Sequence, residues 1–313
     1  MSPVRGSRAA SSLLSRLLVR LHGERWVPPS VLLRVLRVAW GHGLVDRAPS
    51  VDGLWWHDAE GTAYGADLLR GDDAPPRLVV VWLHGGGWFF GSRQGSTPYV
   101  ARLCGDGVVG LVVDYPLAPE RRHPAPLRDL AAALPGLLER AGLGTCPVVL
   151  AGNSAGASYA VALGRLATDE RYAARLRIAP PLPAGRLVGL VLCSGVFSPV
   201  ATRVADRWFT AVLAAASWSM ARSRRWWDSA FARDLEALDA GRLPSTLLLS
   251  ATNDPAHRTQ AVPFLAALRD NGTPVDAWFS DDPDAGHEFH ARPDSPSGRA
   301  SLEQVRAFLA HVG

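Results

Sequence analysis

The segment 148–160, VVLAGNSAGASYA, places one hydroxyl between two glycines where an apolar run gives way to small residues. A strand that enters a tight turn of this kind leaves no space for large side chains two positions before and after its central residue, and Gly152 and Gly156 meet that requirement. The turn would lift the Ser154 hydroxyl out of the sheet, at the positive end of the following helix. Ordinary glycine-rich turns share this pattern, but its position after VVLA favours a nucleophilic serine.

A second glycine-rich segment follows an earlier apolar run. In VVVWLHGGGWFFGS, His84 and the three glycines after it stand at the carboxyl end of a candidate strand, where open α/β sheets build their sites. The backbone N–H groups of Gly85 and Gly86, with that of Ala155, are predicted to form an oxyanion hole. We expect His84 and Gly87 to support this loop, with His84 bracing it and taking no part in proton transfer.

A nucleophilic serine needs a base and a residue that orients the base. The order Ser, Asp, His is typical of sheets with this kind of turn. Asp254 follows the apolar run 246–250, and His287 follows the last candidate strand. Because both would lie on loops at the same sheet edge as Ser154, the three side chains are expected to converge. His287 is predicted to take the serine proton, and Asp254 to hold the imidazole tautomer and stabilise its cation.

Other residues near these positions are competitors. His257 lies close to Asp254 in the sequence, and His290 is three residues beyond His287. A metal cluster could also be drawn from these histidines and from three nearby carboxylates: Asp281, Asp282 and Asp284. On a polar loop such side chains are more often solvated than bound to metal. We therefore expect no metal and no organic cofactor.

Short apolar runs that alternate with helical patterns predict the scaffold. Continuous apolar runs are typical of strands buried on both faces of a parallel sheet, and they occupy 78–83, 108–113, 148–151, 187–192, 246–250 and, more weakly, 275–280. Helical patterns that supply the crossovers occupy 126–142, 155–168, 260–270 and 298–311. Segments 51–59 and 64–70 look like the strands of a hairpin. Residues 51–313 are thus predicted to form one α/β domain with a doubly wound, mostly parallel sheet.

Two segments lie outside this alternation. Residues 201–240 are helical and rich in tryptophan, and we interpret them as a cap insertion. Residues 1–50 are interpreted as an N-terminal helical arm or cap, with an amphipathic pattern over 8–22 and a second helix over 31–40. Packing of this arm on the main domain is the preferred interpretation. A transit peptide and peripheral membrane contact by the basic arm are the alternatives.

The positive charge of the chain is concentrated in its first residues. Residues 1–47 contain eight arginines and two acids, whereas the 313-residue chain carries a formal net charge of only +4. Because the remainder is slightly acidic and has no zinc-finger or RNA-binding signature, nucleic-acid binding is not expected. Three cysteines without CxxC spacing, with no secretory signal or membrane-spanning apolar run, predict a cytoplasmic protein.

Five motifs in a set order carry a family resemblance: HGGGW (84–88), DYPLAPE (114–120), GNSAG (152–156), NDP (253–255) and GHEF (286–289). Together they resemble the hormone-sensitive-lipase-like (bacterial family IV type) esterases and lipases of the α/β-hydrolase fold. The resemblance covers roughly residues 75–312. It implies Ser154, Asp254 and His287 as the catalytic triad, backbone donors in the glycine loop and after the serine, and an N-terminal helical cap over the acyl pocket.

The sequence departs from this family pattern at several positions. Asn153 stands where the family usually has aspartate, Ala157 where a further glycine is common, and Pro116 where arginine is usual. Residues 256–258 are Ala-His-Arg in place of Leu-x-Asp-Glu. These departures remove no catalytic group, and we expect them to affect substrate preference and the local hydrogen bonds.

These observations predict a serine hydrolase that cleaves carboxylic esters of short to medium acyl chains through an acyl-enzyme, with a small apolar ester as substrate. The same triad could instead remove N-acyl groups or transfer an acyl group. The fold is also similar to plant hormone receptors that have lost the catalytic histidine. The presence of His287 favours an enzyme over such a non-catalytic receptor.

Overall fold

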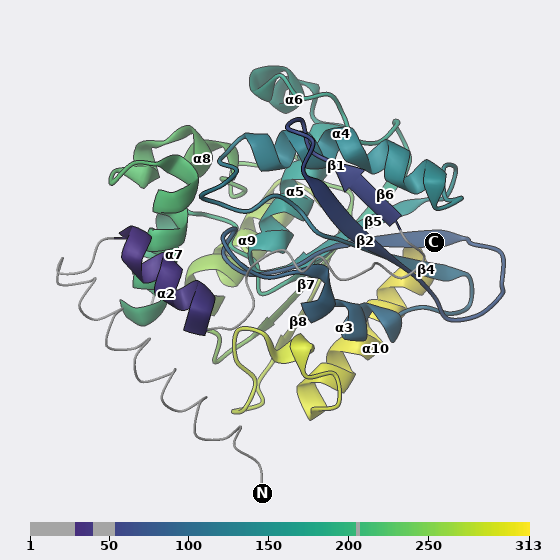
Figure 1. The fold of residues 1–313 in the computed structure, drawn as a ribbon. Coiled ribbons are helices and arrows are strands. Elements are labelled where there is room, and N and C mark those ends of the chain that lie inside the picture. Colours follow the sequence, from purple (N-terminus) through teal and green to yellow (C-terminus); the bar gives the residue numbers. More distant parts are fainter. Residues whose placement is uncertain (1–28, 40–53, 205–206) are drawn as a thin grey trace, which may run out of the picture.

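A twisted sheet of eight strands forms the centre of the protein (Figure 1). The computed structural model describes residues 29–39, 54–204 and 207–313. The strand order across the sheet is β1-β2-β4-β3-β5-β6-β7-β8. The strands are β1 (Leu54–His57), β2 (Ala63–Arg70), β3 (Leu78–Leu83), β4 (Val108–Val113), β5 (Val148–Asn153), β6 (Leu187–Cys193), β7 (Ser245–Ala251) and β8 (Val275–Ser280).

The pairing of the strands agrees with the predicted mixed sheet. β2 is antiparallel to β1 and β4, and all other neighbours are parallel. Every apolar run predicted as a strand is one. β1 ends at His57, two residues before the predicted end, because the Asp58 carboxylate accepts hydrogen bonds from the N–H groups of Glu60 and Thr62 and closes the turn. Residues 51–53 of the predicted hairpin lie outside the described residues.

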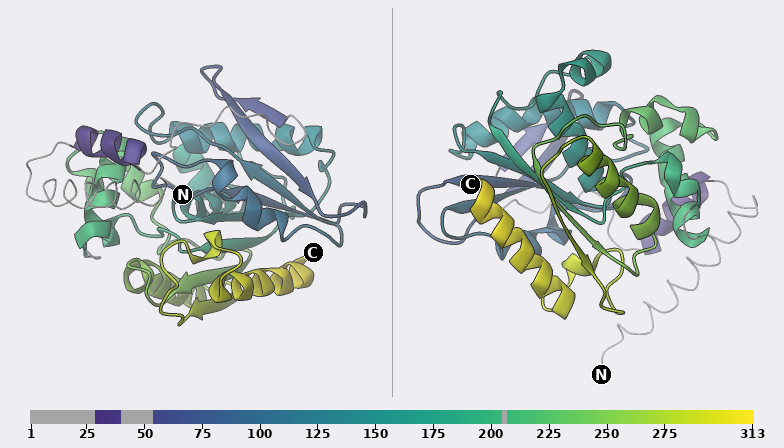
Figure 2. Two further views of the ribbon diagram at one scale, coloured as in Figure 1. Left: turned by 60° about the horizontal axis from the view of Figure 1, so that its bottom comes forward. Right: turned by 180° about the vertical axis from the view of Figure 1, so that it is seen from behind.

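Helices cover both faces of the sheet (Figures 1 and 2). One face packs against α4 (Ala125–Arg140), α5 (Ala155–Thr168) and α9 (Val262–Asp270), and the other against α3 (Thr97–Ala101) and α10 (Pro296–Val312). Successive residues of β3 alternate between the two cores, with Val81 in one and Trp82 in the other. Burial on both faces explains why β3 and β4 carry no polar side chain.

The segment between β6 and β7 is helical, as predicted. It contains the 3-10 turns Val200–Val204 and Trp226–Asp228 and the helices α7 (Arg207–Ala221) and α8 (Ala230–Asp234). Helix α2 (Pro29–Ala39) lies beside α7, although the two are far apart in the sequence (Figures 1 and 2). The helix expected over 8–22 lies outside the described residues. Division of the chain into arm, cap insertion and catalytic domain stays a prediction.

The remaining elements are short. Helix α6 (Glu170–Leu176), the 3-10 turns Arg93–Gly95 and Phe289–Ala291, and the π-helical turn His257–Ala261 complete the described structure. Because of this π turn, α9 begins at Val262 and not at the predicted residue 260. Across residues 29–39, 54–204 and 207–313, no helix has both the length and the apolar character needed to cross a bilayer.

The predicted site loops leave neighbouring strands. β3 and β5 pair in parallel, with Leu83 opposite Gly152, although β4 lies between them in the sequence. The chain therefore reverses its direction of travel across the sheet at this point. Such a switch point opens a crevice at the carboxyl ends of the strands. The glycine loop after β3 and the serine turn after β5 both border this crevice.

Candidate active site

Ser154 occupies a strained turn between β5 and α5. Its φ is 50° and its ψ is −117°, a conformation that residues other than glycine rarely adopt. The glycines two positions before and after Ser154 are required for a different reason, because a side chain at either position would have no room. A Cβ on Gly152 would lie 2.7 Å from the carbonyl oxygen of Leu83, and one on Gly156 would lie 2.1 Å from the same atom. Close contact between this turn and β3 therefore requires both glycines.

Replacing Gly156 by alanine is expected to displace the serine turn. The added methyl group would overlap backbone atoms, and overpacking of this kind costs about 1–3 kcal/mol. The Tm should fall by several degrees in a thermal scan, and ester turnover should fall with it. Gly136→Ala on α4 is the matched control, because its methyl group would meet only the movable end of Arg140. An unchanged Tm for Gly156→Ala would contradict this role for the glycine.

The structure brings the three predicted side chains together. Nε2 of His287 lies 2.9 Å from Oγ of Ser154. Nδ1 of the same ring lies 2.9 Å and 3.0 Å from the two carboxylate oxygens of Asp254. Asp254 is buried after β7 and also accepts the N–H of Ala256 at 2.8 Å. A hydroxyl, an imidazole and a carboxylate thus form one continuous chain of hydrogen bonds.

The charged groups in this chain of hydrogen bonds shift two pKa values in opposite directions. Burial by itself would lower the pKa of His287, but the charge and hydrogen bond of Asp254, helped by Glu288, outweigh burial and raise it above the ordinary value. Burial would raise the pKa of Asp254, but His287 and the N–H of Ala256 outweigh this effect and lower it. The carboxylate therefore stays ionised and stabilises an imidazolium.

The competing histidines lie elsewhere. His257 contacts the hydroxyl of Ser250 through Nδ1 at 3.1 Å, and His290 is buried against the rings of Trp82 and Tyr99. Burial lowers the pKa of both imidazoles. Asp282, one of the three loop carboxylates, accepts the hydroxyl of Ser297. Within the ranges that the structure describes, no group of three or more His, Cys, Asp or Glu side chains is arranged around a common metal position.

The glycine loop after β3 folds back on itself beside Ser154. Gly86 and Gly87 adopt φ values of 118° and 56°, and the carbonyl of Gly86 accepts the N–H groups of Phe89 and Phe90. In the described part of the chain, no loop hydrogen bond uses the N–H of Gly85, Gly86 or Ala155. These amides are the predicted oxyanion donors. Gly85 and Gly86 line the same pocket as Ser154.

A buried polar cluster supports this loop. The His84 ring stacks on Tyr115 with centroids 4.2 Å apart, and the Tyr115 hydroxyl donates to the His84 carbonyl at 2.7 Å. Burial lowers the pKa of His84, so this ring is neutral. Behind it, the fully buried Arg93 pairs with Asp67 and Asp114. Sequence reasoning did not find this arginine, and the only signal was the aspartate that begins DYPLAPE.

The pocket above Ser154 has a volume of about 430 Å³ and mostly apolar walls. Helix α7 supplies Phe209, Val212 and Leu213, and the glycine loop supplies Phe90. The Phe209 ring also meets the His287 ring edge-on, with centroids 5.0 Å apart. The predicted cap insertion therefore contributes to the pocket through these α7 side chains, and none of the described residues that line it is a tryptophan.

Helix α2 is attached to the loop that carries Phe90. The Arg37 guanidinium donates to the carbonyl of Phe89 at 2.7 Å and to that of Ala118. It also forms two hydrogen bonds with the carboxylate of Glu120, at 2.7 and 2.8 Å. One side chain from the N-terminal segment thus joins the glycine loop to the DYPLAPE segment.

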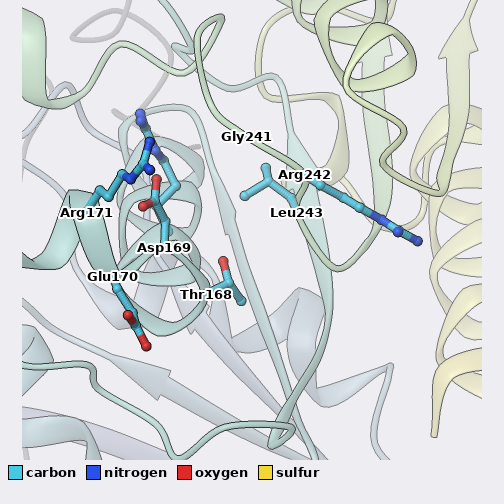
Figure 3. A pocket seen from close by; sticks show the side chains of 8 residues that line it. Thr168, Asp169, Glu170, Arg171, Gly241, Arg242 and Leu243 are labelled. Carbon is cyan, nitrogen blue, oxygen red and sulfur yellow. The ribbon is translucent and has the colours of Figure 1, made fainter.

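A second hollow of about 380 Å³ lies at the junction of α5 and α6 (Figure 3). Residues 168–171 line it on one side and the segment 241–243 on the other (Figure 3). The Asp169 carboxylate accepts the N–H of Tyr172 and begins α6 as its N-cap. This hollow contains none of the predicted site residues, and its lining is of mixed charge. The apolar pocket is therefore the candidate active site.

The chain is similar in sequence to known hydrolases. Residues 80–291 match the family described as alpha/beta hydrolase fold. The carboxylesterase NlhH of Mycobacterium tuberculosis is 38% identical over 146 residues, which are 45% of this chain and 42% of that protein. The acetyl-hydrolase of Streptomyces hygroscopicus is 30% identical over 244 residues, which are 74% of this chain and 75% of that protein. The match with the mycobacterial protein thus spans less than half of its length.

A solved structure has the same arrangement of elements. The esterase of Pyrobaculum calidifontis superposes with a TM-score of 0.69, covering 96% of this chain and 99% of that chain at 19% identity. At this level of identity the likeness concerns the fold alone. The α/β fold predicted from the apolar runs and motifs is confirmed.

Proposed function

Since the chain belongs to the family described as alpha/beta hydrolase fold, we propose that it is a serine hydrolase that cleaves carboxylic esters through an acyl-enzyme. The observation that carries the proposal is the hydrogen-bond chain from Ser154 through His287 to Asp254 at the base of an apolar pocket. The relatives named carboxylesterase and acetyl-hydrolase support it. The proposed triad needs neither a metal nor an organic cofactor.

The first half-reaction makes the acyl-enzyme. His287 takes the proton of Ser154 through Nε2 while the serine oxygen attacks the ester carbonyl, and the negative charge on the carbonyl oxygen develops beside the amides of Gly85, Gly86 and Ala155. Each such donor contributes about 3 kcal/mol to transition-state stabilisation. His287 then gives the proton to the departing alkoxide, and the alcohol leaves. Asp254 stabilises the imidazolium throughout.

Water completes the cycle by the same steps. His287 removes a proton from water, the hydroxide adds to the acyl carbonyl, and the serine oxygen leaves with the proton that His287 returns. A pocket of about 430 Å³ walled by Phe209, Val212 and Leu213 suits a short to medium acyl chain. Esters are favoured over N-acyl compounds because an alkoxide is a better leaving group than an amide anion.

The test is an activity label combined with a substrate profile. A fluorophosphonate should modify Ser154, identified by mass spectrometry of the labelled peptide. The p-nitrophenyl esters of increasing acyl length, an N-acetyl anilide and an added alcohol acceptor would separate hydrolysis of esters, amide cleavage and acyl transfer. Modification at another residue would contradict the assignment of the nucleophile. A protein that is unlabelled, turns over none of these substrates and tightly binds one small molecule would be the non-catalytic receptor.

The pH dependence of kcat/KM should report the raised pKa of His287. The free enzyme needs a neutral imidazole, so activity is lost as pH falls through the pKa of this residue. Because Asp254 and Glu288 outweigh burial and raise that pKa, the midpoint of the acid limb should lie above the ordinary value of 6.5. Initial rates with p-nitrophenyl butyrate from pH 5 to 9 measure it. A midpoint below 6.5 would contradict a raised pKa for His287.

We also propose that the pocket binds a small apolar ester and that the protein works in the cytoplasm. The basic arm is a candidate for peripheral contact with a membrane surface, and residues 1–28 of that arm lie outside the described residues. Vesicle sedimentation with anionic lipid, compared between the full chain and a chain without the arm, measures this contact.

A further inference from the structure

A hydrogen bond between two side chains lies beside the glycine loop. Nδ2 of Asn153 is 3.1 Å from Oε1 of Glu288, so the amide donates and the carboxylate accepts. Asn153 is buried, whereas Glu288 is exposed, and both line the pocket that contains Ser154. Each is also the sequence neighbour of a reacting group, since Asn153 precedes Ser154 and Glu288 follows His287. The pair therefore connects the β5 turn to the loop after β8.

Gly85 is the residue of the glycine loop that this pair contacts. A Cβ on Gly85 would lie 2.4 Å from Nδ2 of Asn153 and 2.7 Å from Oε1 of Glu288. Gly85 is not among the residues with positive φ, so its backbone does not require glycine. The requirement is space for the two side chains. They pack directly against the glycine loop, which lines the pocket.

The side-chain oxygen of Asn153 contacts a second set of residues. Its Oδ1 accepts the indole N–H of Trp82 at 3.2 Å and lies 3.5 Å from the hydroxyl of Ser96. Trp82 is on β3, and Ser96 precedes α3. An asparagine can accept and donate at the same time, whereas an ionised aspartate can only accept. The carboxylate of Glu288 needs a hydrogen-bond donor at position 153. An ionised aspartate at that position would supply none.

We propose that Asn153 and Glu288 form a donor–acceptor pair that positions the glycine loop relative to Ser154 and His287, and that Glu288 is a positioning residue of the reaction. This inference rests on the proposed function. The pair acts through the glycine loop, against which both side chains pack, and through the serine turn, which Asn153 directly precedes. Misplacement of reacting groups by about 1 Å costs on the order of 100-fold in rate, so a bond that sets this spacing affects turnover.

The first test exchanges donor and acceptor. N153D places two carboxylates at hydrogen-bond distance, and their repulsion should lower kcat/KM for p-nitrophenyl butyrate at pH 8 by about tenfold or more. In N153D/E288Q the new glutamine amide donates to the new aspartate carboxylate. This double variant should recover to within about threefold of the parent, because it restores a bond between the same positions. E303Q removes an exposed carboxylate on α10 and is the control for the change in charge.

The second test compares two replacements of the exposed Glu288, which should leave folding intact. E288Q keeps an oxygen acceptor for Asn153, whereas E288A removes it. We expect E288Q to stay within about threefold of the parent at pH 8 and E288A to lose about tenfold. E288Q should also move the acid limb of kcat/KM to lower pH, because the charge of Glu288 contributes to the raised pKa of His287. Burial lowers the pKa of the other histidines near Glu288, which are His84 and His290.

The outcomes separate the pair from the proposed function. Equal losses in N153D and N153D/E288Q, or equal activity of E288A and E288Q, would overturn the positioning role. Rescue in the double variant together with loss in E288A would support it. If the parent protein hydrolyses no ester, the proposed function fails, and the pair is then tested by thermal unfolding alone. In that case N153D should lower the Tm, the double variant should restore it, and an absence of recovery would overturn the pairing.

Discussion

Replacing Ser154 by alanine is expected to lower kcat by about 10⁶-fold, the size of loss seen when a triad nucleophile is removed from a serine hydrolase. The variant keeps the amides of the glycine loop but has no oxygen to form the acyl-enzyme. Its fold should survive, because alanine is smaller and the turn depends on Gly152 and Gly156 for space. Turnover of p-nitrophenyl butyrate, corrected for spontaneous hydrolysis, measures the loss, and near-ultraviolet circular dichroism checks the fold.

Ser217→Ala is the matched control for this change. The Ser217 hydroxyl is buried on α7 and has no hydrogen-bond partner in the described structure, so its loss should alter neither turnover nor the Tm. An S154A protein that keeps more than a few per cent of the parent activity would show that the reaction uses another nucleophile. In that case the fluorophosphonate label would identify it.

Replacing Asp254 by asparagine is expected to lower kcat by about 10⁴-fold while the pocket stays intact. Both oxygens of Asp254 lie within 3.0 Å of Nδ1 of His287, so the carboxylate holds the proton on that nitrogen and leaves Nε2 free to accept from Ser154. An asparagine amide that donates to Nδ1 would stabilise the opposite tautomer. The imidazolium formed during attack would also lose its counter-charge.

Asp281→Asn controls for the loss of one carboxylate near the site, because Asp281 is exposed on the loop that leads to His287. Its kcat should equal that of the parent. The pH profile of D254N gives a second readout, since the pKa of His287 should fall when the charge that opposes burial is removed. A loss of less than about tenfold in D254N would remove Asp254 from the proposed triad.

Much of the scaffold could be predicted because burial leaves a direct mark on the sequence. β3, β4 and β5 are buried throughout, so their residues are apolar except for Asn153 at the end of β5, and the runs stand out. Helices α5 and α10 were predicted within two residues at each end because their apolar faces repeat at helical spacing. The short helices α3 and α6 were not predicted, because a single turn or two carries too little periodicity.

The candidate site could be predicted wherever local chemistry restricts residue type. A serine at φ 50° between glycines, and a glycine run after a buried strand, are constraints that a few adjacent residues reveal. Contacts between distant residues left no such trace. The pairing of Arg93 with Asp67 and Asp114 joins segments that no spacing rule connects. Asn153 was noted only as a departure from the family pattern, and its bond to Glu288 spans 135 positions of the chain.

By itself, the sequence determined the order of strands and helices along the chain, the strained turn at the serine, and the identities of the candidate base and of the carboxylate that orients it. Those features arise from backbone geometry and burial, which act on neighbouring residues and repeat along the chain. The tertiary structure alone decided how closely His287 approaches Ser154 and which side chains wall the pocket, because each depends on how loops from β3, β5, β7 and β8 converge. Convergence of this kind is set by packing across the whole sheet, and no local stretch of residues records it.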